Sequence, residues 1–138
     1  MNIEYKINAP VTTDQFIELL RASTLAERRP VEDRECIEGM LKNSNLTVSA
    51  WENEKLIGIA RAITDFHYAC YLSDLAVDKT CQQTGTGKEL QRITQRQLGP
   101  KCKLIVVSAP SANAYYEHIG YTSNPRCWVL DRNRKISD

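Results

Sequence analysis

Two things are scarce in this sequence: long apolar runs and an excess of one charge. The longest apolar stretches, such as residues 104–107, are far too short to cross a bilayer. The 18 Lys and Arg against 17 Asp and Glu leave a net charge of +1. This balance excludes the broad basic field that drives sequence-independent binding to nucleic acid. We therefore expect neither a membrane nor a nucleic-acid partner.

The cysteines also lack the spacing of a metal site or a disulfide framework. There are 5 of them, an odd number, and none forms a CxxC pair. The first residues lack the basic and then apolar stretch of a secretion signal. We expect a cytoplasmic protein with no metal. The 138 residues suffice for one core, so we expect a single domain over residues 1–131 followed by a polar tail over 132–138.

Hydrophobic periodicity predicts both helices and strands. A capping box between Thr12 and Gln15 begins the first helix, and Pro30 suits the first turn of the second. Alternating apolar residues then predict a three-strand meander. The expected strands are 2–7, 46–51, 56–64, 69–77, 103–108 and 126–130, and the expected helices are 12–23, 30–42, 88–98 and 111–118.

The strands 69–77 and 103–108 flank a helix and form a βαβ crossover. Such a crossover makes the two strands parallel neighbours or near neighbours. Residues 103–108 are almost uninterruptedly apolar. This run predicts a central strand that is covered on both faces.

The segment from Asp78 to Gly87 is the most informative part of the sequence, because a glycine-containing loop there leads from a strand into a helix. Such a loop aims backbone N–H groups and the positive end of a helix dipole at one place, so a phosphate is its natural ligand. A Walker loop would need glycine in place of Gln82 and Ser or Thr in place of Glu89. The dinucleotide fingerprint would need glycine in place of Leu90. Neither ATP, GTP nor NAD is indicated.

Two motifs carry a family resemblance. Residues 82–87, Gln-Gln-Thr-Gly-Thr-Gly, resemble the Q/R-x-x-G-x-G/A pyrophosphate loop of the GNAT superfamily of acyl-CoA-dependent N-acetyltransferases. Residues 112–121 are similar to that family's A-x-x-F/L-Y-x-x-x-G-F/Y element, and the order of elements agrees over nearly the whole chain. The resemblance implies an α/β (α+β) fold: a mixed, mostly antiparallel sheet of six to seven strands, helices on both faces, and a central parallel pair splayed for acyl-CoA.

The resemblance also implies an activity and a site. The enzyme would transfer the acetyl group of acetyl-CoA, its cosubstrate, to a primary amine by direct attack in a ternary complex. Tyr116 holds the position of the family's general acid, with Tyr115 expected in the core. Many members carry an asparagine where this chain has Ala109, and Asn113 is the nearest alternative. The implied cofactor contacts are Leu75, Ala76, Val77, Gln82, Gln83, Thr84, Gly85, Thr86, Gly87, Lys88 and Asn113.

Several alternatives stay open. The base that deprotonates the amine could be Asp74, His67 or a water held by backbone carbonyls. The charged residues 27–29 either contact a charged acceptor or form a solvated loop. A non-catalytic acyl-CoA-binding or regulatory domain, or less favourably a hydrolase using Cys70 or Cys81, would be different functions. The acceptor cannot be read from the sequence, and the last strand is available for pairing with a second copy in a homodimer.

Overall fold

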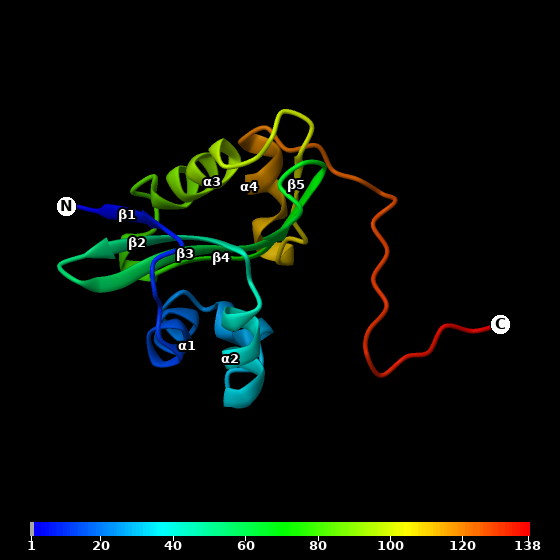
Figure 1. Cartoon of the computed structure of the whole chain (residues 1–138), viewed down its shortest axis with the longest axis horizontal. Coiled ribbons are helices and arrows are strands. Elements are labelled where there is room, and N and C mark those ends of the chain that lie inside the picture. The colour runs from blue at the N-terminus through cyan, green and yellow to red at the C-terminus, as the bar shows by residue number, and fades with distance from the viewer. Residues whose placement is uncertain (1) are drawn as a thin grey trace. The chain divides into compact units, whose positions relative to one another are not determined.

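The computed structural model describes residues 2–138, which divide into two compact units, residues 2–106 and Val107–Asp138. The first unit is a five-stranded sheet in the order β1-β2-β3-β4-β5, with α1 and α2 on one face and α3 on the other (Figure 1). None of the helices that residues 2–138 form has the length and apolarity to cross a membrane. The elements of this unit are β1 (Glu4–Ile7), α1 (Thr13–Ala22), η1 (Leu25–Arg28), α2 (Arg34–Lys42), β2 (Leu46–Glu52), β3 (Lys55–Thr64), β4 (Ala69–Val77), η2 (Lys79–Cys81), α3 (Thr86–Arg96) and β5 (Lys103–Ile105).

Local signals explain the first two helices. The capping box at α1 is confirmed, because Thr12 accepts from the N–H of Gln15 and the Gln15 side chain accepts from the N–H of Thr12. The prediction that α2 begins at Pro30 is wrong. The helix begins at Arg34, where the Asp33 side chain accepts from the N–H of Cys36. A carboxylate cap satisfies an orphan N–H group, which a proline at the first turn cannot do.

The strands confirm the meander and the crossover but not the burial of β5. β2, β3 and β4 pair antiparallel in sequence, and β4 pairs parallel with β5. Within residues 2–138 the sheet has five strands rather than six or seven, and β5 is a three-residue strand at its edge. The prediction of a central strand covered on both faces is wrong, since Ile105 is 39% exposed. An apolar run alone does not distinguish an edge strand from a central one.

The core of the first unit has two layers, one on each face of the sheet. Phe16, Leu20 and Ile37 of α1 and α2 are fully buried on one side. Leu90 of α3 is buried on the other. Gly58 of β3 permits a close approach there, because a Cβ at this position would lie 3.1 Å from Leu90 Cδ1. This packing fixes the beginning of α3 beside β3.

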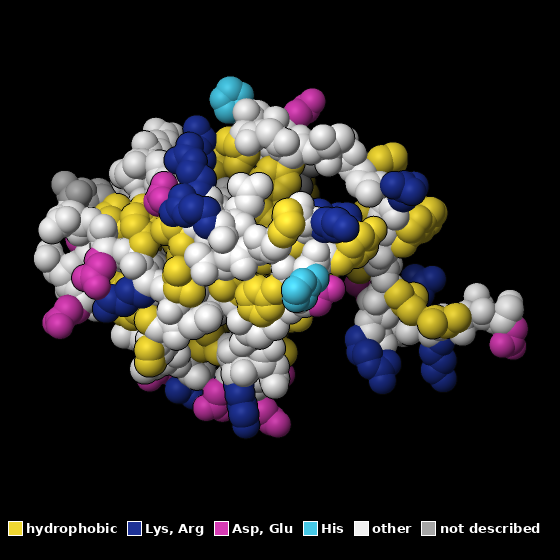
Figure 2. Space-filling model, turned by 45° about the horizontal axis from the view of Figure 1, so that its top comes forward, with side chains coloured by type: hydrophobic (Ala, Val, Ile, Leu, Met, Phe, Trp, Pro, Cys, Tyr) yellow, Lys and Arg dark blue, Asp and Glu magenta, His cyan; other side chains and the backbone are white. Residues whose placement is uncertain are grey.

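The second unit contains η3 (Pro110–Ala112) and α4 (Asn113–His118). Gly120, with φ of 112°, follows α4 in a conformation that favours glycine. The strand predicted over 126–130 does not form, and Trp128 in it is 88% exposed. Figure 2 shows hydrophobic side chains on the surface of the C-terminal segment. Pairing of this segment with a second copy stays a prediction, as does the domain boundary at residue 131.

Candidate active site

A β-bulge interrupts β4 in its middle. The register with β3 passes from Arg61 opposite Asp74 to Ala62 opposite Leu72. Ser73 is therefore an extra residue on β4 with no counterpart on β3. A bulge of this kind changes the direction in which the backbone groups of the following residues point.

Hydrogen bonds at the two ends of β4 show this change. Before the bulge, the N–H of Asp65 donates to the carbonyl of Ala69 at 3.2 Å. After it, the N–H of Asp78 donates to the carbonyl of Ile57 at 2.8 Å. Along a strand, the N–H and C=O groups of successive residues point alternately to its two sides. Ala69 and Asp78 both face β3. The residues whose backbone groups face away from β3 are therefore even-numbered before Ser73 and odd-numbered after it.

The bulge therefore turns the backbone of Leu75 and Val77 toward the β5 side of β4. β5 pairs with β4 only along Ala69–Tyr71. In the chain described, from residue 2 to residue 138, no strand pairs with this side of residues 72–77. The N–H of Leu75 thus lies on an open strand edge, as the splayed pair of the resemblance requires.

The predicted phosphate loop is tied to the end of β4. Gln82 Nε2 donates to the carbonyl of Val77 at 3.0 Å. Asp78 caps η2 by accepting from the N–H of Thr80 at 2.9 Å and from its hydroxyl at 2.8 Å. Burial raises the pKa of Asp78, but these two hydrogen bonds and the nearby Lys55 outweigh it, so the pKa lies below its usual value. The carboxylate therefore stays charged, and its hydrogen bonds to Thr80 fix the backbone where the loop begins.

The beginning of α3 offers backbone donors to a ligand. Gly85 is the N-cap residue, with φ of 84° and no side chain to accept from the first turn. The first intrahelical bond found here runs from the N–H of Glu89 to the carbonyl of Gly85, at 3.0 Å. The preceding N–H groups of residues 86–88 have no place in the helix ladder. Together with the helix dipole, these N–H groups have the geometry that suits an anion.

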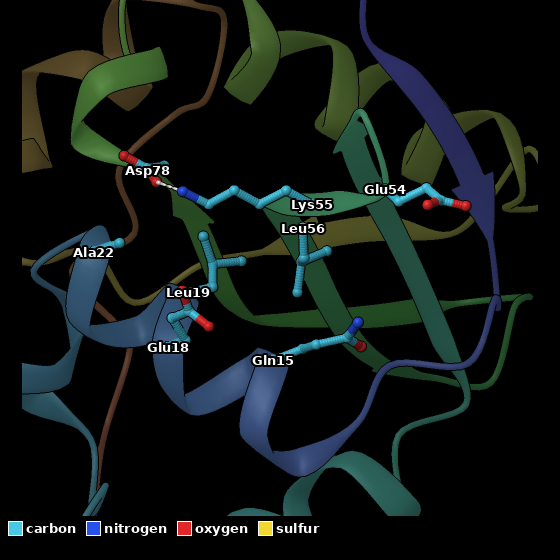
Figure 3. Close-up of a pocket in the computed structure, with 8 residues that line it drawn as sticks. All are labelled: Gln15, Glu18, Leu19, Ala22, Glu54, Lys55, Leu56 and Asp78. Carbon is cyan, nitrogen blue, oxygen red and sulfur yellow. Dashed lines mark ion pairs between the residues drawn. The ribbon is translucent and has the colours of Figure 1, made fainter.

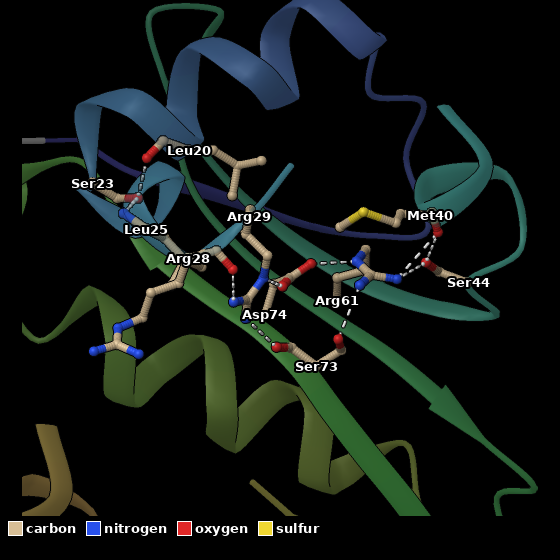
Figure 4. Close-up of polar contacts among 10 residues, drawn as sticks. All are labelled: Leu20, Ser23, Leu25, Arg28, Arg29, Met40, Ser44, Arg61, Ser73 and Asp74. Carbon is tan, nitrogen blue, oxygen red and sulfur yellow. Dashed lines mark hydrogen bonds and ion pairs between the residues drawn. The ribbon is translucent and has the colours of Figure 1, made fainter. Parts of the chain in front are cut away.

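Beside the bulge lies a set of charged and polar groups that we call the Asp74 cluster: Arg29, Arg61, Ser73 and Asp74 (Figure 4). Arg29 Nε donates to Asp74 Oδ1 at 2.5 Å, and Arg61 Nε donates to Asp74 Oδ2. The Asp74 side chain is completely buried, that of Arg61 is 4% exposed and that of Arg29 is 22% exposed. One carboxylate is shared by two guanidinium groups.

These contacts bear on the alternatives for the base. Both oxygens of Asp74 already accept charge-assisted hydrogen bonds away from solvent, an arrangement that favours a structural role over proton abstraction. Asp74 is not solvated at a strand end, because its side chain is completely buried. Arg29 does not belong to a solvated loop either, since its side chain reaches β4. His67 and His118 are exposed, and both histidines of the chain are visible at the surface in Figure 2.

The cysteines do not have the surroundings of a nucleophile. Cys70 and Cys81 are buried. Burial raises the pKa of the Cys70 thiol, which is opposite to what thiolate formation needs. Among residues 2–138, no three His, Cys, Asp or Glu side chains group together as metal ligands would. The structure therefore gives no support to the hydrolase alternative.

The second unit carries the predicted general acid. Tyr116 is partly buried in α4, and its ring makes edge-to-face contacts with Tyr115 at 5.2 Å and with Tyr121 at 5.3 Å between centroids. The expectation of Tyr115 as a core residue is wrong, because it is 36% exposed. Asn113 accepts a hydrogen bond from Ser108 Oγ at 3.1 Å. The aromatic contacts hold the Tyr116 ring within this unit.

A separate cavity of about 270 Å³ lies between α1 and the β2–β3 turn (Figure 3). Lys55 points across it to Asp78, at 3.8 Å. Glu18 and Glu54 add further negative charge to its lining. The cavity meets the candidate site at Asp78, the residue that caps η2.

The structure thus brings together most of the predicted contacts. Residues 75–77 and 82–88 lie at the end of β4 and the start of α3, all within the first unit. Sequence reasoning missed the roles of Arg29 and Arg61. The only signal in the sequence was a charged residue at each position: Arg29 lies in a segment open to interpretation as a solvated loop, and Arg61 lies within an expected strand.

Comparisons with known proteins agree with this geometry. A family model described as an acetyltransferase (GNAT) domain matches residues 14–126. A protein of Prochlorococcus marinus described as an uncharacterized N-acetyltransferase, ycf52-like, is 31% identical over 124 residues, which cover 84% of this chain and 67% of that protein.

Solved structures share the fold. A probable acetyltransferase from meticillin-resistant Staphylococcus aureus superposes with a TM-score of 0.75 and 19% identity, covering 94% of this chain and 98% of that one. The aminoglycoside N-acetyltransferase AAC(6')-Iy, in complex with a bisubstrate analogue of CoA and acetylneamine, has a TM-score of 0.72 and 17% identity, covering 98% and 100%. At these identities the likeness establishes the fold alone.

Proposed function

This chain belongs to the GNAT acetyltransferase family, and from that premise we propose that it transfers the acetyl group of acetyl-CoA to a primary amine by direct attack in a ternary complex. The observation that carries the proposal is the row of N–H groups at the start of α3 that have no place in the helix ladder, next to the part of β4 with which no strand of residues 2–138 pairs on the β5 side. Together they suit the two parts of CoA, an anionic pyrophosphate and an amide-containing arm. Solved relatives of the same fold include complexes with CoA.

The pyrophosphate would bind the backbone N–H groups between Gln82 and Lys88. Gly85 supports this role, because its positive φ opens the loop and its missing side chain leaves the first turn of α3 uncapped. The arm would pair with residues 75–77 as an added strand, using backbone groups that no strand occupies within the described part of the chain. Lys88, exposed on the first turn of α3, adds positive charge.

The chemistry needs an oxyanion donor and a proton donor. The amine nitrogen forms a bond to the thioester carbon, and negative charge develops on the carbonyl oxygen, where the N–H of Leu75 would stabilise it. The carbon–sulfur bond then breaks, and its electron pair leaves with the CoA sulfur. Tyr116 would supply the proton to this thiolate, since a phenol is protonated at neutral pH. Its assignment rests on its place in the motif of residues 112–121.

The attacking amine loses a proton to His67, to Asp74 or to a water held by backbone carbonyls. The burial of Asp74 between two arginines favours the water or His67. We propose a cytoplasmic location, since the 5 cysteines are an odd number without a CxxC pair. The acceptor class is left to experiment.

A binding assay paired with a turnover assay tests the proposal against the non-catalytic alternative. Calorimetric titration with acetyl-CoA should show binding, and release of the CoA thiol should depend on one or more amines from a panel of polyamines, aminoglycosides, aromatic amines and amino acids. Binding without amine-dependent release would favour the regulatory domain. Absence of binding would contradict both.

A further inference from the structure

The two arginines of the Asp74 cluster bind the β4 bulge by hydrogen bonds from the α1–α2 face of the sheet. Arg29 Nη2 donates to the carbonyl of Ser73 at 2.8 Å, and Arg61 Nη2 donates to the hydroxyl of Ser73 at 3.0 Å. The same two side chains bind the carboxylate of Asp74 (Figure 4). Both residues at the bulge are therefore held by both arginines.

The arginines are in turn anchored to the helical side of the unit. Arg61 Nη1 donates to the carbonyl of Met40 at 3.1 Å and to Ser44 Oγ at 2.9 Å, at the end of α2. Arg29 follows η1 and donates from Nη1 to the carbonyl of Arg28 at 2.8 Å. The connection between α1 and α2 is thereby tied to the middle of β4.

We propose that Arg29 and Arg61 are positioning residues that fix the Ser73 bulge and thereby aim the N–H of Leu75 at the thioester carbonyl of acetyl-CoA. This inference rests on the proposed function. It follows from the alternation of backbone groups described above: without the extra residue at Ser73, the N–H of Leu75 would face β3 and be used in the sheet. The direction of the donor depends on the bulge, and the bulge is fixed by the two arginines.

Three variants separate positioning from general stability. Arg29→Lys keeps the positive charge beside Asp74, but an ammonium lacks the fork that reaches the carboxylate and the Ser73 carbonyl together. Ser73→Ala removes one hydroxyl and leaves both ion pairs, so it serves if Arg29→Lys fails to fold. Arg34→Lys is the matched control, because the Arg34 side chain is 58% exposed and pairs with Asp14 rather than with the cluster.

The readout is the infrared carbonyl band of protein-bound acetyl-CoA labelled with ¹³C at the carbonyl carbon, measured beside the affinities for acetyl-CoA and CoA. We expect Arg29→Lys and Ser73→Ala to move the band toward its position in free acetyl-CoA. We also expect Arg29→Lys to slow single-turnover acetyl transfer at least tenfold, because small misplacements of a reacting group have effects of this size. CoA affinity should fall by a smaller factor than the rate of acetyl transfer, since the arm would pair with residues 75–77 through several backbone groups, and Arg34→Lys should match the wild type.

Unchanged bands in both variants would overturn the inference, even if their melting temperatures fall, because the cluster would then be structural only. That result would leave the proposed function standing as long as the wild type binds acetyl-CoA and turns it over. A wild-type protein that binds neither acetyl-CoA nor CoA would overturn the proposed function itself.

Discussion

Arg29 and Asp74 lie 45 positions apart in the chain, yet Arg29 Nε is 2.5 Å from Asp74 Oδ1. Their contact joins the segment after η1 to the middle of β4. Because Asp74 is also bound by Arg61, its removal would leave two guanidinium groups without a counterion. The stability of the first unit should therefore be sensitive to this one carboxylate.

We expect Asp74→Asn to lower the free energy of unfolding by about 3–5 kcal/mol, the usual effect of breaking a buried ion pair from one side. Urea titration followed by circular dichroism measures it. Asp14→Asn is the control: Asp14 also pairs with an arginine, Arg34, at 2.7 Å, but its side chain is 81% exposed. Exposed pairs contribute about 0–1 kcal/mol. Equal effects of the two substitutions would contradict the structural role of Asp74.

Gly87→Asp should weaken acetyl-CoA binding at least tenfold without destabilising the fold. A carboxylate in the first turn of α3 interacts favourably with the helix dipole but repels a pyrophosphate at the same N–H groups. Gly87→Asn, of nearly the same size and without charge, separates repulsion from steric hindrance. Isothermal titration of both variants tests this, and unchanged affinity in a folded Gly87→Asp protein would exclude the loop as the phosphate site.

Asp65 should make the β3–β4 turn sensitive to acid. The N–H groups of Tyr68, Ala69 and His67 donate to its carboxylate and lower its pKa to about 2. Because the folded pKa lies below the unfolded value, this stabilisation is present above about pH 4 and is lost as the pH falls toward 2. The stability difference between the wild type and Asp65→Asn should shrink over that range. A carboxyl titration by NMR with a midpoint near 4 would contradict it.

Tyr116→Phe should preserve acetyl-CoA binding and slow acetyl transfer by about 10²–10⁴-fold, the usual contribution of general acid catalysis. The ring contacts with Tyr115 and Tyr121 survive the substitution, so the fold should be unaffected. Single-turnover measurements avoid masking by slow product release. Tyr115→Phe is the control on the neighbouring position. If Tyr115→Phe transfers the acetyl group more slowly than Tyr116→Phe, the general acid is misassigned.

The features that the sequence predicted correctly depend on neighbouring residues. The capping box links Thr12 to Gln15, and the alternation of 69–77 is contained within β4 itself. The glycine-containing loop before α3 was also predicted from local residues, because its glycines and the helix start are adjacent in sequence; its role as a phosphate site stays a prediction. Short-range signals of this kind need no knowledge of the tertiary fold.

The features that the sequence could not predict are long-range. The two arginines of the Asp74 cluster come from 45 and 13 positions away, and no local pattern marks them as partners. The edge position of β5 depends on which strands form beyond it, and not on its own apolar residues. The start of α2 is a local feature that sequence reasoning missed: Pro30 was expected in the first turn, whereas the Asp33 side chain caps a helix that begins at Arg34.

The measurement that tests the account most directly is a single-turnover reaction between the preformed wild-type–acetyl-CoA complex and the best amine of the panel. Products are followed by rapid quenching and mass spectrometry. Direct attack predicts acetylated amine and free CoA in equal amounts, formed at the same rate, with no acetyl group on the protein. An acetylated protein that forms before the product, or CoA release at the same rate without amine, would contradict the account.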